Sequence, residues 1–409
     1  MTDPRLIEDL TIGAVEVLPE ASLEAKLAVA EREARQLRVK LGVDPTAPDI
    51  HLGHTVVLNK LRQFQDAGHK AILIIGDYTA RIGDPSGRSK TRPRLAPEVI
   101  NANARTYQEQ AFLILDDDPA KLEVRHNGEW LGALTMEQVF ELMSTTTVAR
   151  ILERDDFDKR FSAHQPISLL EMFYPLAQGY DSVAVCADIE LGGTDQKFNL
   201  FMGRDLQEYF GQEPQVVFTL DILPGTDGVE RMSKSTGNYI AVGEDPRDIY
   251  GKVMSVPDEV IMTYFRLVTA HHADELREME RALADGSTGP RDLKARLARE
   301  IIARLRGGEA AAEAEEHFDR VFRRRLAADD VQTLALRLDD EEGGMVYLPA
   351  VMERWFDITR SEGRRRVEQG GVTVDGEAVT QLSLSADALV GKRVKAGKSA
   401  KFQGLVARS

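Results

Sequence analysis

Apolar and polar positions follow two different spacings over the first 245 residues of the chain. Three segments carry apolar residues every three or four positions, which is typical of helices, namely 50–67, 99–115 and 196–210. Three shorter segments are rich in apolar residues and of strand length, namely 70–76, 182–187 and 215–220. Because strands that alternate with helices usually run side by side in one direction, the pattern predicts an α/β domain with a parallel sheet.

After residue 246 the pattern changes to helical spacing alone, which continues to residue 338, with clear examples at 292–305 and 310–325. This predicts a second, all-helical domain. The acidic and glycine residues at 339–344 then have the composition of an exposed linker. We therefore expect three domains, at 1–245, 246–344 and 345–409.

The composition is that of an ordinary globular protein of 409 residues, of which 43% are hydrophobic and 29% charged. It excludes disordered and collagen-like chains, and no apolar stretch reaches the roughly 18 residues that a membrane helix needs. The N-terminal residues lack the basic and apolar regions of a secretory signal. With a single cysteine, Cys186, the chain forms no internal disulfide, so we expect a cytoplasmic protein.

Charge is distributed unevenly along the chain. The whole sequence has a formal net charge of −15, which as an average argues against a nucleic-acid partner. Residues 345–409 nevertheless carry 11 Lys and Arg against 7 Asp and Glu, a net +4, whereas residues 1–344 carry 41 against 60, a net −19. The tail is thus electrostatically distinct from the body.

The first candidate site is the segment 42–54, GVDPTAPDIHLGH, in which prolines and aspartates force a turn before the first predicted helix. We expect Asp49 to cap that helix and His51 and His54 to share its first turn. Unpaired N–H groups at a helix start favour phosphates, and Gly53 leaves room for a flat ligand. The alternative is that the two histidines only cap and pack. A zinc site is disfavoured, because no further ligand has suitable spacing.

Two further segments combine glycines or small residues with cations. Residues 83–92, GDPSGRSKTR, form a glycine-bounded turn with three cations, which suits a polyphosphate; the alternative is a solvated surface turn. Residues 230–238, ERMSKSTGN, place hydroxyl side chains around Lys234 in a loop that can bring donors onto a leaving group. In isolation this loop would be an ordinary polar turn.

The three segments together resemble the class I aminoacyl-tRNA synthetases, whose two signature motifs match His51-Leu-Gly-His54 and, about 180 residues later, Arg231-Met-Ser-Lys-Ser235. Within that class the chain is similar to tyrosyl-tRNA synthetases of the bacterial type, through the segments 83–87, 174–181 and 192–196. The tail at 355–377 resembles the small RNA-binding fold of the S-four-like ribosomal type. The resemblance implies a Rossmann-like nucleotide-binding domain, a helical anticodon-side domain and a small α+β RNA-binding domain.

The resemblance also implies a two-step reaction. ATP activates tyrosine to tyrosyl-adenylate with release of pyrophosphate, and the tyrosyl group then passes to the 3′ end of its tRNA. ATP is a substrate, Mg²⁺ is bound with it, and no separate protein metal site is expected. A homodimer is implied as well. Two rivals stay open, which are tryptophan specificity on the same fold and a non-catalytic RNA-binding paralogue.

The same resemblance implies roles for individual residues. Catalytic contacts to the phosphates are expected from Thr46, His51, His54, Arg88, Arg92, Arg231 and Lys234. The ATP site adds Gly53, Asp195, Met232, Ser233 and Ser235. Tyrosine is expected to bind between Asp44, Asp84, Tyr174, Gln178, Asp181 and Gln196. Of these, Asp181 would accept a hydrogen bond from the phenol hydroxyl. Contacts to tRNA are expected from Arg360, Arg364, Arg365, Arg366, Lys392 and Arg393.

Three positions depart from the family pattern. Lys40 stands where many bacterial members have a tyrosine that helps to bind the phenol hydroxyl, and Arg231 and Arg88 stand where lysines are usual. For Lys40 three alternatives stay open: it points outward, it pairs with an acid such as Asp77, or it replaces the missing contact. Because Lys234 and both motif histidines are retained, we expect a variant enzyme rather than an inactive one.

Overall fold

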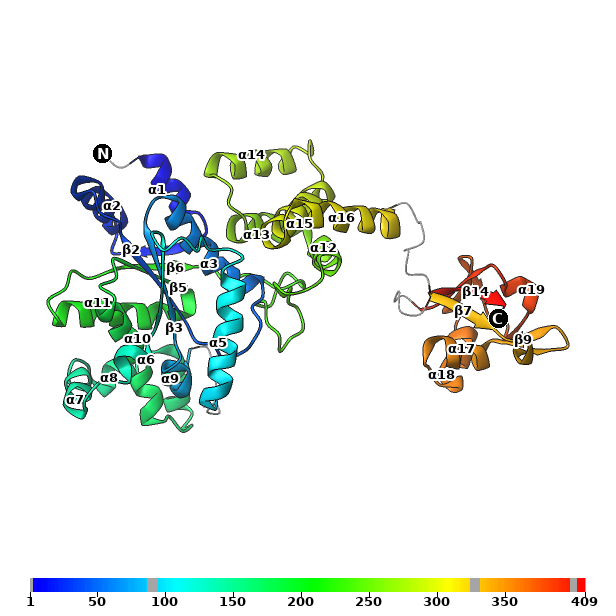
Figure 1. The fold of residues 1–409 in the computed structure, drawn as a ribbon, viewed down its shortest axis with the longest axis horizontal. Helices are drawn as coiled ribbons and strands as arrows, with labels where there is room; N and C mark the ends of the chain where they lie inside the picture. Colours follow the sequence, from blue (N-terminus) through cyan, green and yellow to red (C-terminus); the bar gives the residue numbers. More distant parts are fainter. Residues whose placement is uncertain (1–2, 87–94, 324–331, 398–402, 409) are drawn as a thin grey trace. The chain divides into compact units, whose positions relative to one another are not determined.

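The computed structural model describes residues 3–86, 95–323, 332–397 and 403–408. The chain forms two compact units, Met1–Glu315 and Glu316–Ser409 (Figure 1). Each unit has its own buried hydrophobic interior. The first unit is built on a large sheet, and the second is a small domain of short strands and helices.

A six-stranded sheet forms the centre of the first unit, in the order β1-β6-β5-β2-β3-β4. The strand bounds are Ala14–Leu18 (β1), Arg38–Val43 (β2), Lys70–Ile75 (β3), Leu122–His126 (β4), Ile189–Gly193 (β5) and Val216–Leu220 (β6). Neighbouring strands from β6 to β4 run parallel, while β1 pairs antiparallel with β6 at the edge. The predicted α/β domain with a parallel sheet is confirmed.

The strand order changes direction at β2. From β2 the chain moves outward to β3 and β4 on one side, and β5 and β6 later fill the other side. β2 and β5 are neighbours in the sheet, and the chain leaves them toward opposite sides. In open parallel sheets, such a change of direction opens a crevice at the carboxyl ends of the two strands. A ligand site is therefore expected beyond Val43 of β2 and Gly193 of β5.

Helices pack against this sheet, with α3 on β2, β3 and β5, and α11 on β5 and β6. The helix bounds up to β6 are Pro4–Thr11 (α1), Ser22–Glu33 (α2), Leu52–Asp66 (α3), Thr79–Ile82 (α4), Pro97–Ala111 (α5), Gly128–Leu131 (α6), Met136–Ser144 (α7), Val148–Ile151 (α8), Asp155–Ser162 (α9), Leu169–Ala184 (α10), Thr194–Gln196 (η1) and Lys197–Tyr209 (α11). Glycines allow α10 and α11 to approach closely, since a Cβ on Gly179 would lie 3.1 Å from the backbone nitrogen of Gly203.

One strand predicted from the sequence is wrong. Residues 182–187 complete helix α10 and the turn after it, and the strand β5 begins only at Ile189. Ser182 and Val183 are buried against the rest of the domain, so their apolar character fits a buried helix end as well as a strand. A six-residue run is too short for hydrophobic spacing to separate these two structures.

After β6 and the irregular segment 221–245, helices follow one another through the end of the first unit and up to residue 323. Their bounds are Pro246–Ser255 (α12), Asp258–Val260 (η2), Ile261–Val268 (α13), Ala273–Ala284 (α14), Pro290–Arg306 (α15) and Gly308–Phe318 (α16), followed by a π-helical turn at Asp319–Arg323 (η3). They agree with the helical spacing after residue 246. The three predicted domain boundaries stay predictions.

The second unit contains two small sheets, β11-β10-β13-β14-β7 and β12-β9-β8. Its elements are Gln332–Leu336 (β7), Leu338–Asp340 (η4), Glu341–Glu342 (β8), Met345–Tyr347 (β9), Leu348–Phe356 (α17), Arg360–Glu368 (α18), Val372–Val374 (β10), Glu377–Val379 (β11), Ser383–Ser385 (β12), Ala386–Leu389 (α19), Arg393–Ala396 (β13) and Gln403–Arg408 (β14). Helices and strands together give the predicted small α+β domain.

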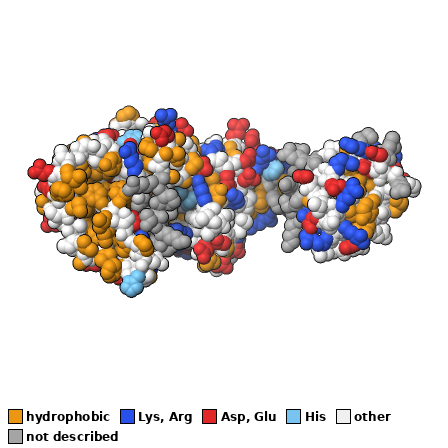
Figure 2. Space-filling view, turned by 90° about the horizontal axis from the view of Figure 1, so that it is seen from below, with side chains coloured by type: hydrophobic (Ala, Val, Ile, Leu, Met, Phe, Trp, Pro, Cys, Tyr) orange, Lys and Arg blue, Asp and Glu red, His pale blue; other side chains and the backbone are white. Residues whose placement is uncertain are grey.

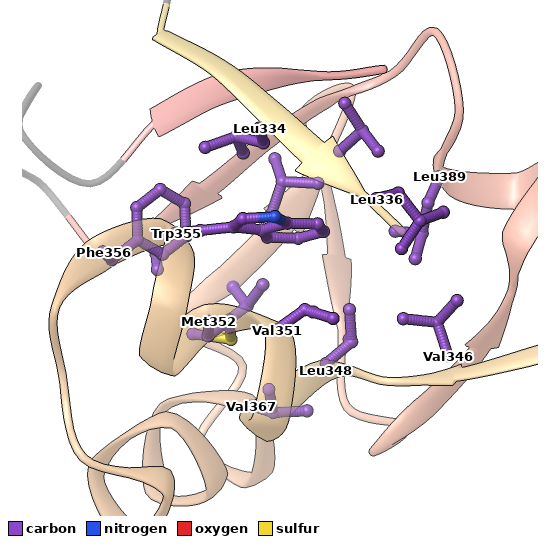
Figure 3. Close-up of a cluster of buried hydrophobic side chains, with 14 of the residues drawn as sticks. Leu334, Leu336, Val346, Leu348, Val351, Met352, Trp355, Phe356, Val367 and Leu389 are labelled. Atoms are coloured by element: carbon purple, nitrogen blue, oxygen red, sulfur yellow. The ribbon is translucent and has the colours of Figure 1, made fainter. Parts of the chain in front are cut away.

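A compact core holds the second unit together. Side chains of β7 and α17, among them Leu334, Leu336 and Trp355, meet in its centre (Figure 3). The Trp355 indole N–H also donates to the carbonyl oxygen of Ala335 at 2.9 Å.

Strand β7 ties the segment before residue 345 to this unit, because it pairs in parallel with β14. The expectation of helices alone up to residue 338 is therefore wrong at its end. The acidic stretch 339–344, predicted to be an exposed linker, instead belongs to the η4 turn and the β8–β9 hairpin.

In the part of the chain that the structure describes, no helix is long and apolar enough to cross a membrane. The single cysteine, Cys186, is a free, exposed thiol in the turn before β5. It lies near the amino end of that strand, away from the carboxyl ends at which a ligand is expected.

Candidate active site

A cavity of about 240 Å³ lies at the carboxyl ends of β2, β3 and β5, where the strand order changes direction. Eight of the predicted site residues line it, namely Asp44, Thr46, His54, Asp84, Tyr174, Gln178, Asp181 and Gln196. Asp195 lines a neighbouring, larger cavity of about 850 Å³. The fold thus gathers residues as far apart in the sequence as Asp44 and Gln196 around one crevice.

The two motif histidines form the cap of α3. The ring of His51 accepts a hydrogen bond from the Gly53 N–H at 3.2 Å, and the ring of His54 accepts one from the His51 N–H at 3.2 Å. The predicted cap Asp49 is thus wrong, since His51 takes the N-cap position. A Cβ on Gly53 would lie 2.9 Å from the His51 ring, so the absence of a side chain there makes room for that ring.

Both histidines are neutral at physiological pH. Burial, with smaller effects from the charges of His54 and Lys234, lowers the pKa of His51 to about 3. Burial and the charge of Lys234 lower the pKa of His54 to about 4. A neutral imidazole has one ring nitrogen that donates and one that accepts. Because both rings accept bonds from the helix cap through one nitrogen, the other nitrogen carries the proton and can donate to a phosphate oxygen.

The loop that contains Lys234 meets the start of α3. The Lys234 ammonium donates to the Asp49 carbonyl oxygen at 2.8 Å and lies 3.5 Å from the Asp49 carboxylate. Backbone bonds from Leu52 to Ile240 at 3.0 Å and from Val242 to Ile50 at 2.9 Å join the same two segments. The two motifs that lie far apart in the sequence are therefore adjacent in the fold.

Inside this loop, Asn238 fixes the backbone around the lysine. Its side-chain oxygen accepts from the Ser233 N–H at 2.9 Å, and its amide group donates to the Arg231 carbonyl oxygen at 3.2 Å. The charge of Arg231 also acts on Asp195, whose pKa is raised, mainly by burial and further by the charge of Asp84. Arg231 thus lies close enough to Asp195 for its charge to oppose the rise in the Asp195 pKa.

One end of the cavity concentrates negative charge. The Tyr174 hydroxyl donates to one Asp44 oxygen at 2.9 Å, and the Thr79 hydroxyl donates to the other at 2.6 Å. The Gln196 amide donates to Asp84 at 2.8 Å. Two carboxylates held by neutral donors form a site suited to a primary ammonium group.

A third carboxylate, Asp181, lies deeper and is almost fully buried. It accepts hydrogen bonds from the Trp130 indole N–H at 2.8 Å and from the Asn127 amide at 3.3 Å. Burial raises the pKa of Asp181 to about 7, while the charge of Lys40 and these two hydrogen bonds oppose the rise. Asp181 can therefore accept a hydrogen bond from a ligand hydroxyl when it is ionised.

Trp130 and Asn127 were not identified from the sequence, and neither was Thr79. A signal for them exists, since Asn127 directly follows β4 and Thr79 follows β3, both at carboxyl ends of parallel strands. Trp130 lies one helical turn after Asn127.

Lys40 is fully buried, so it does not point outward. Its ammonium group forms an ion pair with Glu190 at 2.8 Å, and not with Asp77. Asp77 instead accepts a hydrogen bond from the Gly128 N–H at 2.8 Å. The alternative in which Lys40 pairs with an acid is the one that the structure supports, with a different acid.

The predicted tRNA-contacting residues lie in the second unit, on α18 and around β13. Most of them form exposed ion pairs, namely Arg360 with Glu353 at 2.7 Å, Arg364 with Glu368 at 2.7 Å, Arg365 with Glu362 at 2.6 Å and Lys392 with Asp375 at 2.9 Å. Arg366 differs, because it also donates to the Ala396 carbonyl oxygen at 2.8 Å and so supports the fold. Arg393 is half-buried within β13.

Two predicted residues, Arg88 and Arg92, lie outside the described residues. Among the residues that are described, no group of three His, Cys, Asp or Glu side chains could hold a metal ion.

Comparisons with known proteins show to which family the chain belongs. A family described as class I tRNA synthetases (W and Y) matches residues 32–323. The chain is 53% identical to a tyrosine–tRNA ligase of Moorella thermoacetica, over 96% of this chain and 94% of the relative. It is 49% identical to a tyrosine–tRNA ligase of Thermotoga maritima, over 95% and 94% of the two chains.

Solved structures share the fold. A tyrosyl-tRNA synthetase from Archaeoglobus fulgidus, complexed with L-tyrosine, superposes with a TM-score of 0.59 at 23% identity, over 76% of this chain and 99% of that one. A truncated mitochondrial tyrosyl-tRNA synthetase from Aspergillus nidulans gives 0.65 at 21% identity, over 78% and 95%. Sequence identity over nearly the full length, rather than these distant folds, decides the relationship: the chain belongs to the tyrosyl-tRNA synthetase family, within the class I tRNA synthetases.

Proposed function

We propose that the protein is a tyrosine–tRNA ligase that activates L-tyrosine with ATP and then transfers the tyrosyl group to the 3′ end of its tRNA. The observation that carries this proposal is one cavity that is lined by Asp44, Asp84 and Asp181 and lies beside the start of α3. Such a cavity offers an ammonium site, a hydroxyl acceptor and phosphate donors in one crevice.

In the first step, a carboxylate oxygen of tyrosine forms a bond to the α-phosphorus of ATP, and the bond to the bridging oxygen breaks to release pyrophosphate. The carboxylate is already a nucleophile, so no protein nucleophile is needed. The chain's part is to position the groups and to stabilise charge on the triphosphate. Lys234, Arg231, His51 and Thr46 serve this purpose, together with Arg88 and Arg92, while Gly53, His54, Met232, Ser233 and Ser235 shape the nucleotide site.

The nucleotide carries Mg²⁺ with it, and Asp195 binds its ribose. The ammonium group of tyrosine lies among Tyr174, Gln178 and Asp84, with Gln196 and Asp44 nearby. Its phenol hydroxyl then reaches Asp181. A site that hydrogen-bonds a substrate hydroxyl rejects the analogue without one, because the buried acceptor would be left unpaired, and tyrosine against phenylalanine is the standard example in this enzyme class.

The second unit serves the tRNA. Its exposed ion pairs, such as those of Arg364 and Lys392, contribute little to stability because solvent screens them. The basic side chains can therefore leave their acidic partners and bind RNA phosphates at a small cost in free energy. The tail thus supplies part of the RNA affinity although the chain as a whole has a net charge of −15.

We further infer a homodimer that acts in the cytoplasm, where tRNA is used. Several large apolar side chains of the first unit are exposed on neighbouring helices, namely Met136 (66%), Phe140 (62%), Met143 (53%), Phe161 (60%) and Leu169 (83%). Figure 2 shows a broad hydrophobic area on the side of the first unit that it presents. Apolar patches of this kind usually mark a protein interface, and a second copy of the chain would cover this one.

The test is tyrosine-dependent exchange of labelled pyrophosphate into ATP, run across all twenty amino acids. We expect exchange with tyrosine and a severe loss in Lys234→Ala. Exchange with tryptophan alone would overturn the specificity. No exchange with any amino acid would support the rival, a non-catalytic RNA-binding protein.

A variant of Asp181 tests the phenol site. Asp181→Ala should weaken activation of tyrosine more than activation of phenylalanine, because only tyrosine presents a hydroxyl to the acceptor. An equal effect on both amino acids would remove Asp181 from the phenol site.

A further inference from the structure

A buried ion pair lies beneath the cavity and has no role in the reaction described so far. Lys40 on β2 and Glu190 on β5 are 0% and 1% exposed, with their charged atoms 2.8 Å apart. Taking two charges out of water is costly, and a buried ion pair is seldom more stabilising than an apolar pair of the same size. Its position next to the amino-acid site therefore calls for a functional reason.

All three donors of the Lys40 ammonium are used within the protein. They go to Glu190 at 2.8 Å, to the Ser182 hydroxyl at 2.8 Å and to the Gln178 carbonyl oxygen at 3.1 Å. An ammonium group has only three protons to donate. Lys40 therefore has none left for a ligand, and it does not take over a direct hydrogen bond to the phenol.

Glu190 is equally saturated, and one of its partners lines the cavity. One carboxylate oxygen accepts from Lys40 and from the Gln178 amide at 3.4 Å, and the other accepts from the hydroxyl of Ser182 at 3.0 Å and from the Gln215 amide. The Gln178 side-chain oxygen in turn accepts from Asn199 at 2.9 Å. The pair thus fixes Gln178 through both its backbone and its side chain.

The pair also acts on Asp181, which lies between Gln178 and Ser182 on α10. Lys40 exerts the largest favourable charge effect on the ionised carboxylate, whereas Glu190 exerts a smaller, opposing one. The other groups around Asp181 are neutral donors, Trp130 and Asn127. Tyr174 from the same helix lies close enough for its own ionisation to be coupled to Asp181.

We propose that Lys40 and Glu190 are positioning residues for amino-acid recognition: the pair holds Gln178 in place and keeps Asp181 ionised, so that Asp181 accepts the phenol hydroxyl without a second direct contact. The proposal rests on the tyrosine–tRNA ligase function proposed above. The buried charges of Lys40, Glu190 and Asp181, rather than a further hydroxyl group, then determine the selectivity for tyrosine over phenylalanine.

The experiment measures KM for tyrosine and for ATP in pyrophosphate exchange from pH 6 to 9, with melting temperatures as a check on folding. Lys40→Met removes the ammonium group and leaves Glu190 without a counter-charge, so the double variant Lys40→Met/Glu190→Gln is measured beside it. Lys60→Met is the matched control, because Lys60 is another buried lysine, bonded to the Leu10 carbonyl oxygen and away from the cavity.

In Lys40→Met we expect the pH midpoint for tyrosine binding to rise by about one unit or more, as for a carboxylate that loses a nearby cation. KM for tyrosine at pH 7 should then rise about fivefold or more and recover at pH 9, while KM for ATP stays near the wild-type value. Activation of phenylalanine should change little. The double variant should show the same shift, smaller in size, because it also removes the opposing charge of Glu190.

An unchanged pH midpoint for tyrosine in the folded double variant would overturn the proposal, and so would an equal shift in Lys60→Met. Parallel changes in KM for tyrosine and for ATP would also overturn it, since they indicate a merely structural role. If the wild-type protein shows no tyrosine-dependent exchange at all, the proposed function fails instead, so the two failures are distinguishable.

Discussion

The histidines at the start of α3 combine two tasks. Their rings accept hydrogen bonds from the helix cap, and they are buried beside Lys234, so neither ring readily gains a proton. A neutral imidazole donates one hydrogen bond to a phosphate without adding a full charge. In the proposed reaction, stabilisation by full positive charge is therefore left to Lys234 and Arg231.

A histidine NMR titration of the free protein tests this assignment. Since their pKa values are about 3 and 4, the rings of His51 and His54 should stay neutral from pH 5 to 8. His271, which lies between Glu275 and Glu300, should titrate above the usual 6.5, chiefly because it is hydrogen-bonded to Glu300. Variants His51→Gln and His54→Gln assign the signals. A midpoint above pH 5 for either motif histidine would contradict the assignment.

The sequence predicted candidate residues that belong to short motifs. It did not reveal pairs of residues that lie far apart in the sequence and meet only in the folded chain. His51, Asp44, Tyr174 and Asp181 follow from the resemblance of short segments. The partner of Lys40 could not be found in this way, because Glu190 is 150 residues away and meets it only through the pairing of β2 with β5. Burial of both charges is likewise a property of the sheet, not of either segment.

At the scale of elements, the contact of α10 with α11 supports the floor of the active site. A Cβ on Gly203 would lie 2.5 Å from the Gln215 amide nitrogen, 2.9 Å from the Ser182 hydroxyl and 3.1 Å from a Glu190 carboxylate oxygen. These atoms belong to the hydrogen-bonded network around Lys40, so they cannot move aside freely.

Gly203→Ala should therefore lower the free energy of unfolding by about 1–3 kcal/mol, as for overpacking of a filled interior. Gly251→Ala in α12 is the matched control, since a Cβ there meets no atom within 4 Å. That change should raise the free energy of unfolding by about 0.5–1 kcal/mol. Urea denaturation measures both values, and equal effects would show that the network tolerates the extra methyl group.

His271 forms ion pairs that join α14 to α15. The His271 ring is hydrogen-bonded to Glu300 at 2.8 Å and to Glu275 at 3.0 Å. The pKa of His271 is raised in the folded state, mainly by the hydrogen bond to Glu300. The protonated ring therefore contributes stability below about pH 6.5, which is lost as pH rises through the folded pKa. The melting temperature of the wild type should fall more between pH 6 and 8 than that of His271→Gln. Parallel curves would contradict the prediction.

Long periodic elements were the best predicted from the sequence. The segments at 50–67 and 99–115 correspond to α3 and α5, and the apolar run at 70–76 corresponds to β3. The error at 182–187 arose because the buried end of α10 is apolar over only a short stretch. Strand β7 was missed because its partner, β14, lies about 70 residues later in the chain.

At the scale of the whole molecule, the two compact units divide the labour of the proposed reaction. The first contains the cavity lined by Asp44, Asp84 and Asp181, and the second contains the basic side chains that are proposed to contact tRNA. Each unit has its own hydrophobic core.

Removal of residues 316–409 should therefore leave pyrophosphate exchange largely intact and abolish charging of tRNA. The two activities are measured on the same truncated protein, with the full chain as control. Undiminished charging would show that the second unit is dispensable for tRNA. Loss of exchange would show that the first unit depends on the second.

The exposed apolar area on α7, α9 and α10 gives a prediction for assembly. Phe140→Glu should convert a dimer to a monomer in sedimentation experiments, because a charge there would be buried at the interface. Val15→Glu, at an exposed apolar position on β1, should leave the mass unchanged. A wild-type protein that sediments as a monomer would refute the dimer.

The isolated thiol of Cys186 has a practical consequence. Since the chain has one cysteine and its side chain is exposed, a maleimide dye would attach at a single position without any substitution. That position precedes the amino end of β5, whereas the cavity lies at the carboxyl ends of the strands. The unaltered enzyme can thus carry one fluorescent dye at Cys186. Energy transfer between this dye and a second dye on the tRNA would then report on tRNA binding during turnover.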